Sequence, residues 1–338
     1  MPEMTFSAAI DAALDAAMAD DDRILVLGED VQALRRNLYV RFGAHRVRNT
    51  PISESAMLGA GLGAAMVGLR PVVEIMFVDF VPVAMDMLVN HVAKLAAFSN
   101  GQWGAPLVIR AACGGGYGDG GQHEQSLWGM LAGIPGLTVV VPSTPADAAG
   151  LLRSALEHDG PVVFLEHKLL AEDWLHQLAG TGRPGVHFDV PSDGAKGEVT
   201  DPLEPVPLGV AALRRPGRDL AIVGVGVGVH RGLAAATRLA EDGIDAAVLD
   251  LRSVAPLDRA ALLGLAALTG KVLVVDEDYA RGGLSGEIAA VIAENGIAAR
   301  FARVTCEDTI PYARLLEEQT LPNVTRLMSA AHQLVGAS

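Results

Sequence analysis

The sequence has few aromatic residues, almost no cysteine and a deficit of positive charge. Aromatic side chains make up 4% of its 338 residues, so the apolar volume of any core must come from Ala, Val, Leu, Ile and Met. The two cysteines, Cys113 and Cys306, lie far apart without CxxC spacing, which excludes a disulfide framework and a structural zinc site. Hydrophobic residues still reach 50%, which indicates a folded chain. At roughly 150 residues per domain, the length indicates two domains.

The shortage of positive charge bears on possible partners. Lys and Arg number 26 against 40 Asp and Glu, which gives a formal net charge of −14. A polyanionic backbone would be repelled, so we expect no nucleic-acid partner, and an anionic membrane surface is equally disfavoured. The uncharged stretch over residues 55–69, rich in Gly and Ala, is shorter than the roughly 20 residues of a spanning helix. Residues 1–17 lack the basic stretch of a signal peptide, so we expect a cytoplasmic location and no membrane association.

Short β-branched runs alternate with Ala- and Leu-rich runs, a pattern typical of an α/β fold with a parallel sheet. The predicted strands are residues 23–27, 72–77, 107–111, 137–141, 162–165, 220–225, 246–251, 271–275 and 300–304. The predicted helices are residues 55–68, 82–98, 122–133, 145–157, 230–242, 258–268 and 284–295. We therefore predict a larger α/β domain over residues 1–170 and a smaller one over 208–338. Prolines break the periodicity over residues 171–207, which we predict to be an extended linker.

Glycines at 224, 226 and 228 follow a predicted strand and precede a helix, with Asp250 at the end of the next strand. This arrangement invites a dinucleotide-binding interpretation and hence a nicotinamide dehydrogenase. The spacing is GxGxG, however, and Val229 stands where a third glycine would permit close packing of the helix. A tight glycine turn is favoured.

The triplet Gly118-Asp119-Gly120 resembles the start of the diphosphate- and magnesium-binding motif of thiamin diphosphate enzymes. That motif needs an Asn about two dozen residues later, and no Asn occurs between Asn100 and Asn295. Since Mg²⁺ requires near-octahedral oxygen ligation, one Asp without its partner is a weak site. We interpret the triplet as part of a glycine-rich loop and assign no metal ligand to this chain. If the chain handles this cofactor, another chain must hold the phosphates.

Glu54 is the only acid between Asp30 and Glu74, and it precedes the apolar run 56–66. The carboxylate could interact with the helix dipole at the N-terminus of that helix. Equally, desolvation could raise its pKa and let it share a proton with a buried heterocycle nitrogen. The residue alone leaves both interpretations open.

Two further residues are candidates for contact with a ligand. Phe80 is a large aromatic just beyond the carboxyl end of a predicted strand, where a stacking role is possible. Nearby Met76 is, from its pattern, an ordinary core candidate. His123 follows a glycine-rich loop and starts a predicted helix. It could cap that helix, lie in solvent, or take part in proton transfer or anion binding.

These features together resemble the beta subunit of the thiamin-diphosphate-dependent decarboxylating component of 2-oxo acid dehydrogenase complexes, especially the pyruvate and acetoin dehydrogenase branch. The similar segments follow one another in family order over most of the chain. They are TPISESAMLGAGLGAAMVGLRPVVEIMFVDF (50–80), GQHEQSLWGMLAGIPGLTVVVPSTPADAAGLL (121–152), PVVFLEHKLL (161–170), DLRSVAPLD (250–258) and VLVVDEDYARGGLSGEIA (272–289).

The resemblance implies a parallel-sheet pyrimidine-binding domain, a transketolase C-terminal-like domain, and an active site shared with an alpha subunit. Glu54 matches the family glutamate that hydrogen-bonds the pyrimidine nitrogen of thiamin diphosphate. Ile52, Met76 and Phe80 match positions that line that ring, and His123 matches the active-site histidine. In the family, the alpha subunit holds Mg²⁺ and the diphosphate, which accounts for the missing Asn.

The resemblance also implies a two-alpha, two-beta assembly that acts on a 2-oxo acid or an acyloin and transfers an acyl group to a lipoyl carrier. Two alternatives remain: a specialised acyl transferase that loads a carrier protein in a biosynthetic pathway, and a non-catalytic scaffold of the same fold. The Ala- and Gly-rich helix over 55–68 can pack closely across a subunit interface.

Overall fold

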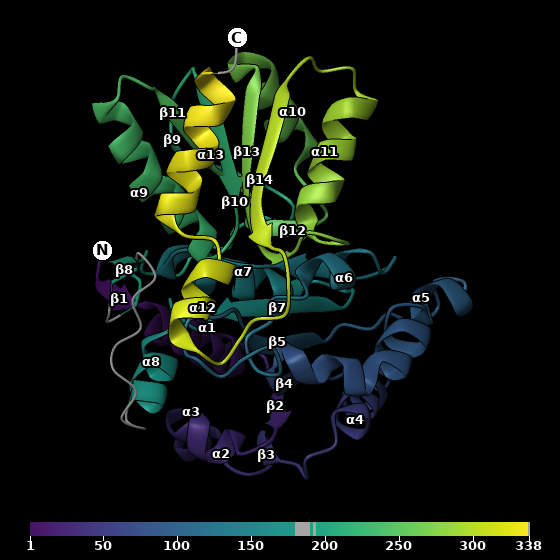
Figure 1. Ribbon diagram of the computed structural model, residues 1–338. Helices are drawn as coiled ribbons and strands as arrows, with labels where there is room; N and C mark the ends of the chain where they lie inside the picture. Colours follow the sequence, from purple (N-terminus) through teal and green to yellow (C-terminus); the bar gives the residue numbers. More distant parts are fainter. Residues whose placement is uncertain (180–189, 192–193, 337–338) are drawn as a thin grey trace.

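Two large β-sheets with helices on their faces, and one two-stranded sheet, form the described part of the protein. The computed structural model describes residues 1–179, 190–191 and 194–336. Figure 1 shows the smaller sheet standing above the larger one, with the C-terminal helices beside it. The α/β fold class with mostly parallel sheets is confirmed, and each of the nine predicted strands is present. None of the helices in these ranges has the length and apolar character needed to cross a bilayer.

The larger sheet has seven strands, and all of its neighbouring strands are parallel except the pair at one edge. In spatial order the strands are β12 (Ser253–Ala255), β6 (Thr138–Val140), β7 (Val162–His167), β5 (Val108–Cys113), β4 (Arg70–Phe77), β2 (Ile24–Gly28) and β3 (Val47–Asn49). Neighbouring residues on one strand enter different cores: Val72 packs in one apolar cluster and Val73 in the other. The sheet is therefore covered on both faces, as the continuous apolar runs predict.

Helices α1 (Phe6–Asp20) and α7 (Pro145–Glu157) pack together on one face of this sheet. Helix α4 (Glu54–Met66) packs against β4 on the opposite face of the sheet, in the other of the two apolar clusters. Helix α7 begins as predicted: Pro145 occupies its first turn, and the Thr144 hydroxyl accepts the Asp147 amide at 3.2 Å. The short helices α2 (Val31–Leu34) and α3 (Arg36–Phe42) were not predicted.

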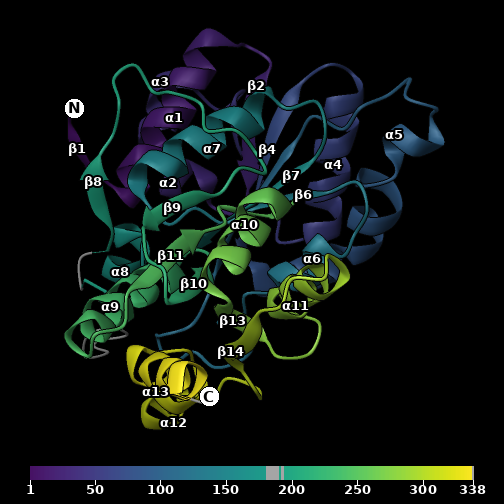
Figure 2. The ribbon, with the colours of Figure 1, turned by 90° about the horizontal axis from the view of Figure 1, so that it is seen from above.

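The smaller sheet has the order β14 (Arg300–Cys306), β13 (Lys271–Tyr279), β10 (Leu220–Gly224), β11 (Ala246–Asp250) and β9 (Ala212–Arg215). Its helices divide between the two faces, as Figures 1 and 2 show. One face carries α9 (Val227–Glu241) and α13 (Val324–Gly336), and the other carries α10 (Arg259–Thr269) and α11 (Leu284–Glu294). Helix α12 (Arg314–Thr320) lies below this sheet, next to the larger domain.

The segment 82–98, predicted to be one helix, is helical over most of its length but is not a continuous α-helix. The chain instead forms a 3-10 helix (Val78–Ala84), a π-helical turn (Met87–Val92) and the short helix α5 (Leu95–Phe98). In the π turn, the Ala93 amide donates to the Leu88 carbonyl, five residues back, at 3.0 Å. This spacing inserts one extra residue and ends the regular α-helical ladder.

The predicted helix over 122–133 is mostly wrong, because helix α6 spans only Trp128–Ala132. The Gln125 amide donates to Asp79 Oδ1 at 3.1 Å instead of to a helical carbonyl. His123 therefore lies on a loop and does not cap a helix.

The segment 171–207, predicted to be an extended linker, contains regular structure where it is described. Helix α8 (Glu172–Ala179) follows β7, and strand β8 (Lys196–Glu198) pairs antiparallel with the N-terminal strand β1 (Glu3–Thr5). Residues 180–189 and 192–193 of this segment lie outside the described ranges. The prolines mark the break in periodicity correctly, but they do not exclude short elements on either side of it.

Candidate active site

Three aromatic rings meet where β4 ends. Phe77 is the last residue of β4, Phe80 lies one turn later, and His123 comes from the loop after β5. The His123 ring centroid lies 5.9 Å from each phenyl centroid, and the two phenyl rings are 5.6 Å apart. The structure thus brings together the predicted residues Phe80 and His123. It adds Phe77, which the sequence pattern assigned to the strand.

Lys168 contacts the backbone of the His123 loop and two neighbouring aromatic rings. Its Nζ donates a hydrogen bond to the His123 carbonyl and lies 4.7 Å from the Phe77 ring centroid and 5.3 Å from that of Tyr117. The side chain is buried, and burial lowers its pKa from the ordinary value. This residue was not predicted from the sequence, because it follows the polar residues Glu166 and His167 and no pattern marks it as buried.

A second contact fixes the same loop to the turn after β4. Asp79 Oδ1 accepts hydrogen bonds from the amide and the side-chain Nε2 of Gln125, at 3.1 and 2.9 Å. The Tyr279 hydroxyl, from the end of β13, donates to Gln125 Oε1 at 3.0 Å. The smaller domain therefore contributes directly to the position of the His123 loop.

Glu54 is the first residue of α4 and is half-buried. The start of this helix is attached to the 3-10 helix that carries Phe80, because the Ser55 hydroxyl donates to the Val83 carbonyl at 2.8 Å. Glu29, at the end of β2, lies close enough to interact electrostatically with Glu54; burial chiefly, with the charges of Asp30 and Glu54, raises its pKa. Full removal of the Glu54 carboxyl from water would require another surface against it.

Ile52 precedes this helix and is 70% exposed. A large aliphatic side chain with this exposure can line a binding site only if a ligand or a partner covers it.

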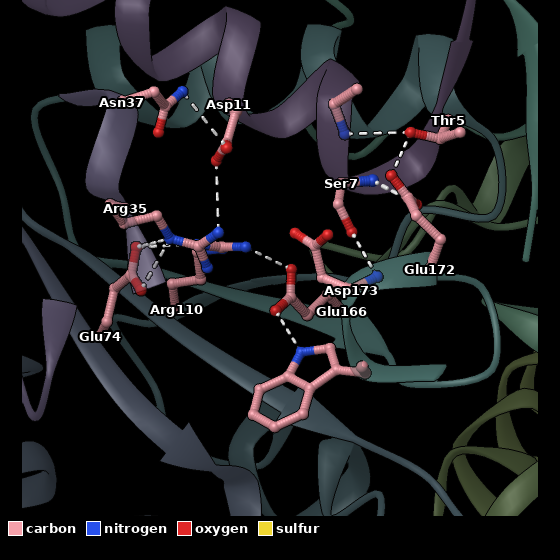
Figure 3. Close-up of polar contacts among 12 residues, drawn as sticks. Thr5, Ser7, Asp11, Arg35, Asn37, Glu74, Arg110, Glu166, Glu172 and Asp173 are labelled. Carbon is pink, nitrogen blue, oxygen red and sulfur yellow. Dashed lines mark hydrogen bonds and ion pairs between the residues drawn. The ribbon is translucent and has the colours of Figure 1, made fainter. Parts of the chain in front are cut away.

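Met76 lines a cavity of about 420 Å³ between the sheet and helices α1, α2 and α8. The wall of the cavity contains an ion-pair network, shown in Figure 3. Arg110 bridges Glu74 and Glu166 at 2.7 and 2.6 Å, and Arg35 contacts Glu74 at 3.0 Å. Burial alone would raise the pKa of Glu74, but the charges of Arg35 and Arg110 outweigh it and hold the pKa below its ordinary value. Each of the two buried carboxylates is thus paired with an arginine, which offsets the cost of burying its charge.

The glycine-rich loop does not present a free phosphate cradle. The amides of residues 116–119 all donate to the carboxylates of Glu124 and Glu317. The described residues contain no group of three or more His, Cys, Asp or Glu side chains arranged to hold a metal ion. The four amides of this loop are therefore not free to bind a phosphate.

The second glycine run is a turn against the larger domain. Gly226 has φ +51°, and a Cβ there would lie 3.2 Å from Val141 Cγ1. Asp250, the candidate ribose ligand, is buried and accepts hydrogen bonds from Arg214 Nη2 at 2.8 Å and from the Ser143 hydroxyl. Its carboxylate is engaged within the chain, which argues against the dinucleotide interpretation.

Comparison with known proteins identifies both domains. Residues 2–172 match the transketolase pyrimidine-binding domain, and residues 209–327 match the transketolase C-terminal domain. A solved split-gene transketolase, described as an inactive beta4 tetramer, superposes with a TM-score of 0.78 at 24% identity and covers 98% of both chains. That likeness establishes the fold.

Curated relatives match over nearly their full length. The chain is 38% identical to the 2-oxoisovalerate dehydrogenase subunit beta of Bacillus subtilis, covering 99% of both sequences. It is 36% identical to the pyruvate dehydrogenase E1 component subunit beta of the same organism, again with 99% coverage of both. It is 35% identical to an acetoin:2,6-dichlorophenolindophenol oxidoreductase subunit beta of that organism, with 98% and 97% coverage.

Proposed function

Because the chain belongs to the transketolase-like family of beta subunits of thiamin-dependent 2-oxo acid and acetoin dehydrogenases, we propose that it forms half of such an active site. An alpha subunit supplies the other half and holds Mg²⁺ and the diphosphate. The complete enzyme takes an acyl group from a 2-oxo acid or an acyloin and passes it to a lipoyl carrier. The arrangement of Glu54, Phe80 and His123 at one edge of the larger sheet carries this proposal.

Each of these residues has a defined task. Glu54 holds a proton at a ring nitrogen of the aminopyrimidine, with Ile52, Met76 and Phe80 against the ring. When bound, thiamin diphosphate supplies a carbon nucleophile and an electron sink for cleavage next to the ketone. His123 moves a proton or stabilises negative charge on the substrate oxygen. Phe77 and Phe80 fix the imidazole and exclude water from it.

The exposure of this edge supports a second subunit. Ile52 is 70% exposed and Glu54 only half-buried, so a single chain leaves the proposed ring site open to solvent. A partner surface laid over α4 would desolvate Glu54 and complete the site.

The proposal is tested by copurifying the chain with the protein encoded beside it and assaying the pair with thiamin diphosphate and a panel of 2-oxo acids and acyloins. We expect Glu54→Gln to lower turnover by roughly 10²–10⁴-fold, the typical contribution of a positioned acid–base group. Size-exclusion chromatography should show the same assembly as the unchanged chain.

Glu287→Gln is the matched control, because Glu287 is also in the first turn of an apolar helix, α11, but is exposed in the smaller domain. It should leave turnover unchanged. Near-normal turnover of Glu54→Gln would remove Glu54 from the mechanism, and a copurified pair inactive on every substrate would favour a scaffold.

A further inference from the structure

Two carboxylates from distant parts of the chain grip the glycine-rich loop that precedes His123. Glu317 Oε1, on α12, accepts the amides of Gly116 and Gly118 at 2.9 and 3.0 Å. Glu124 Oε1 accepts the intervening amides of Tyr117 and Asp119, at 2.9 and 2.8 Å. The four consecutive amides thus alternate between the two acids.

The second oxygen of each carboxyl group has no partner of the ordinary kind. Glu124 and Glu317 are 0% and 1% exposed, and within the described ranges neither Oε2 atom meets a conventional hydrogen-bond donor. The two carboxyl groups accept the amides of adjacent residues and so lie next to each other, and Glu317 acts on Glu124 both as a hydrogen-bond partner and through its charge. A hydrogen bond between two carboxyl groups requires one of them to carry a proton.

The surroundings do not supply enough positive charge to keep both acids ionised. The charge of Lys168 and the donated amide of Asp119 favour the ionised form of Glu124, but burial and the neighbouring Glu317 outweigh both and raise its pKa. Tyr117 is buried beside it, and burial raises the pKa of that phenol, so it is neutral. Two adjacent buried carboxylates in such a place behave like other close acid pairs, which retain one proton.

We propose that Glu124 and Glu317 share one proton between their Oε2 atoms, and that this acid pair positions the His123 loop. The positioning role rests on the proposed function, whereas the shared proton does not. The pair joins helix α12 to the loop, and Lys168 then holds the loop at the His123 carbonyl. Loss of the proton would place two like charges in contact and loosen the four amide bonds.

The pH range in which the proton is held follows from the same contacts. Burial chiefly, and then the hydrogen bond to Glu317 and its charge, raise the pKa of Glu124 to about 9. The proton at Glu124 is therefore retained at neutral pH and lost as the pH rises toward that value. The loop is therefore held in neutral solution and released in alkaline solution.

Infrared spectroscopy of the full-length chain without cofactor tests the shared proton directly, since a protonated carboxyl absorbs apart from a carboxylate. At pH 7.5 we expect a carboxylic-acid band that disappears on titration above about pH 9. Glu124→Gln and Glu317→Gln should each abolish the band, because an amide can donate in place of the acid and leaves the partner ionised.

Glu318→Gln, the next residue of α12, is half-exposed and should keep the band. Absence of the band in the unchanged chain, or its persistence in either Gln variant of the pair, would overturn the proposal. The titration of the unchanged chain decides the matter even if a variant fails to fold.

The positioning role is tested in the copurified pair of subunits by the pH profile of turnover. The unchanged enzyme should lose turnover on the alkaline side as the acid pair ionises, and Glu124→Gln should lack that alkaline decline while retaining turnover at pH 7.5. An unchanged alkaline limb in the variant would refute the positioning role. An inactive assembly with the infrared band present would count against the proposed function and leave the shared proton intact.

Discussion

Arg110 shows how single residues carry buried charge in this protein. Figure 3 shows it between Glu74 and Glu166. It lies on β5, the central strand of the larger sheet, and all three side chains are less than 10% exposed. Removing one partner of a buried ion pair leaves an uncompensated charge, which typically costs about 3–5 kcal/mol. We expect Arg110→Met, which keeps most of the side-chain volume, to lower the unfolding free energy by that amount in urea denaturation.

Arg153→Met provides the control at this scale. Arg153 contacts Glu157 one turn along α7 at 3.5 Å, and both side chains are in contact with solvent. Exposed pairs of this kind contribute about 0.5 kcal/mol or less. Equal effects of the two substitutions would show that the Arg110 network does not stabilise the interior.

Single residues of the site differed in how far the sequence could predict them. Phe80 was singled out because it follows the end of a predicted strand, and His123 because it follows a glycine-rich loop. The structure brings the two rings to 5.9 Å, a contact that the sequence did not predict. Lys168 and the Glu124–Glu317 pair could not be predicted, since their roles depend on residues 45 and 193 positions apart in sequence meeting in space. Sequence spacing carries no information about such distant contacts.

At the level of elements, continuous apolar runs predicted strands better than they predicted helices. A parallel strand that is buried on both faces appears in the sequence as a short continuous apolar run. All nine strands predicted from such runs are present. The break of 82–98 into three short pieces had no signal, because residues 83–98 contain neither proline nor glycine. The short strands β1, β8 and β12 were missed because three residues are too few to show periodicity.

The contact between α6 and the loop before α11 offers a test at this scale. Gly129 lies in α6, and a Cβ on it would come within 2.4 Å of the Gly282 carbonyl oxygen and 2.7 Å of Gly283 Cα. Both atoms belong to the backbone, which cannot move aside as a side chain can. Overpacking of this kind costs about 1–3 kcal/mol, so we expect Gly129→Ala to lower the urea midpoint.

Gly264→Ala should have the opposite effect. Gly264 is in α10, where a Cβ would meet no atom within 4 Å. Replacing a helical glycine by alanine then stabilises by about 0.5–1 kcal/mol. If Gly129→Ala also stabilised the chain, the contact between α6 and the smaller domain would have to be looser than the structure shows.

At the scale of the whole molecule, strand pairing and hydrogen bonds hold the two domains together in addition to the segment that connects them. Strand β12 follows the second sheet's β11 in sequence but pairs with β6 at the edge of the first sheet. Glu277, on β13, accepts hydrogen bonds from the Gly115 amide and from His167 Nε2, each at 2.8 Å. The sequence predicted two α/β units, whereas this coupling requires knowledge of their arrangement.

The proposed contact with an alpha subunit also concerns the molecule as a whole, because it depends on an exposed face of α4. Ala56, Ala60 and Gly63 on α4, and Val67 directly after its end, follow one another at helical spacing and are all exposed. Val67 is 79% exposed, although it is large and apolar. A face of small apolar side chains lets two backbones approach closely, and beside Ile52 and Glu54 it is the surface that a partner must cover to complete the site.

Gly63→Leu should therefore block assembly without harming the chain itself. A Cβ at Gly63 meets no atom within 4 Å, and leucine has the higher helix propensity by nearly 1 kcal/mol, so the isolated subunit should be at least as stable. In a coexpression experiment we expect the partner to be lost from the purified variant by light scattering. Gly286→Leu, equally open but on α11 of the smaller domain, should retain the partner. Because the control matches the substitution and the helical setting, retention of the partner by both variants would mean that α4 faces solvent in the assembly and that Glu54 is desolvated by another surface.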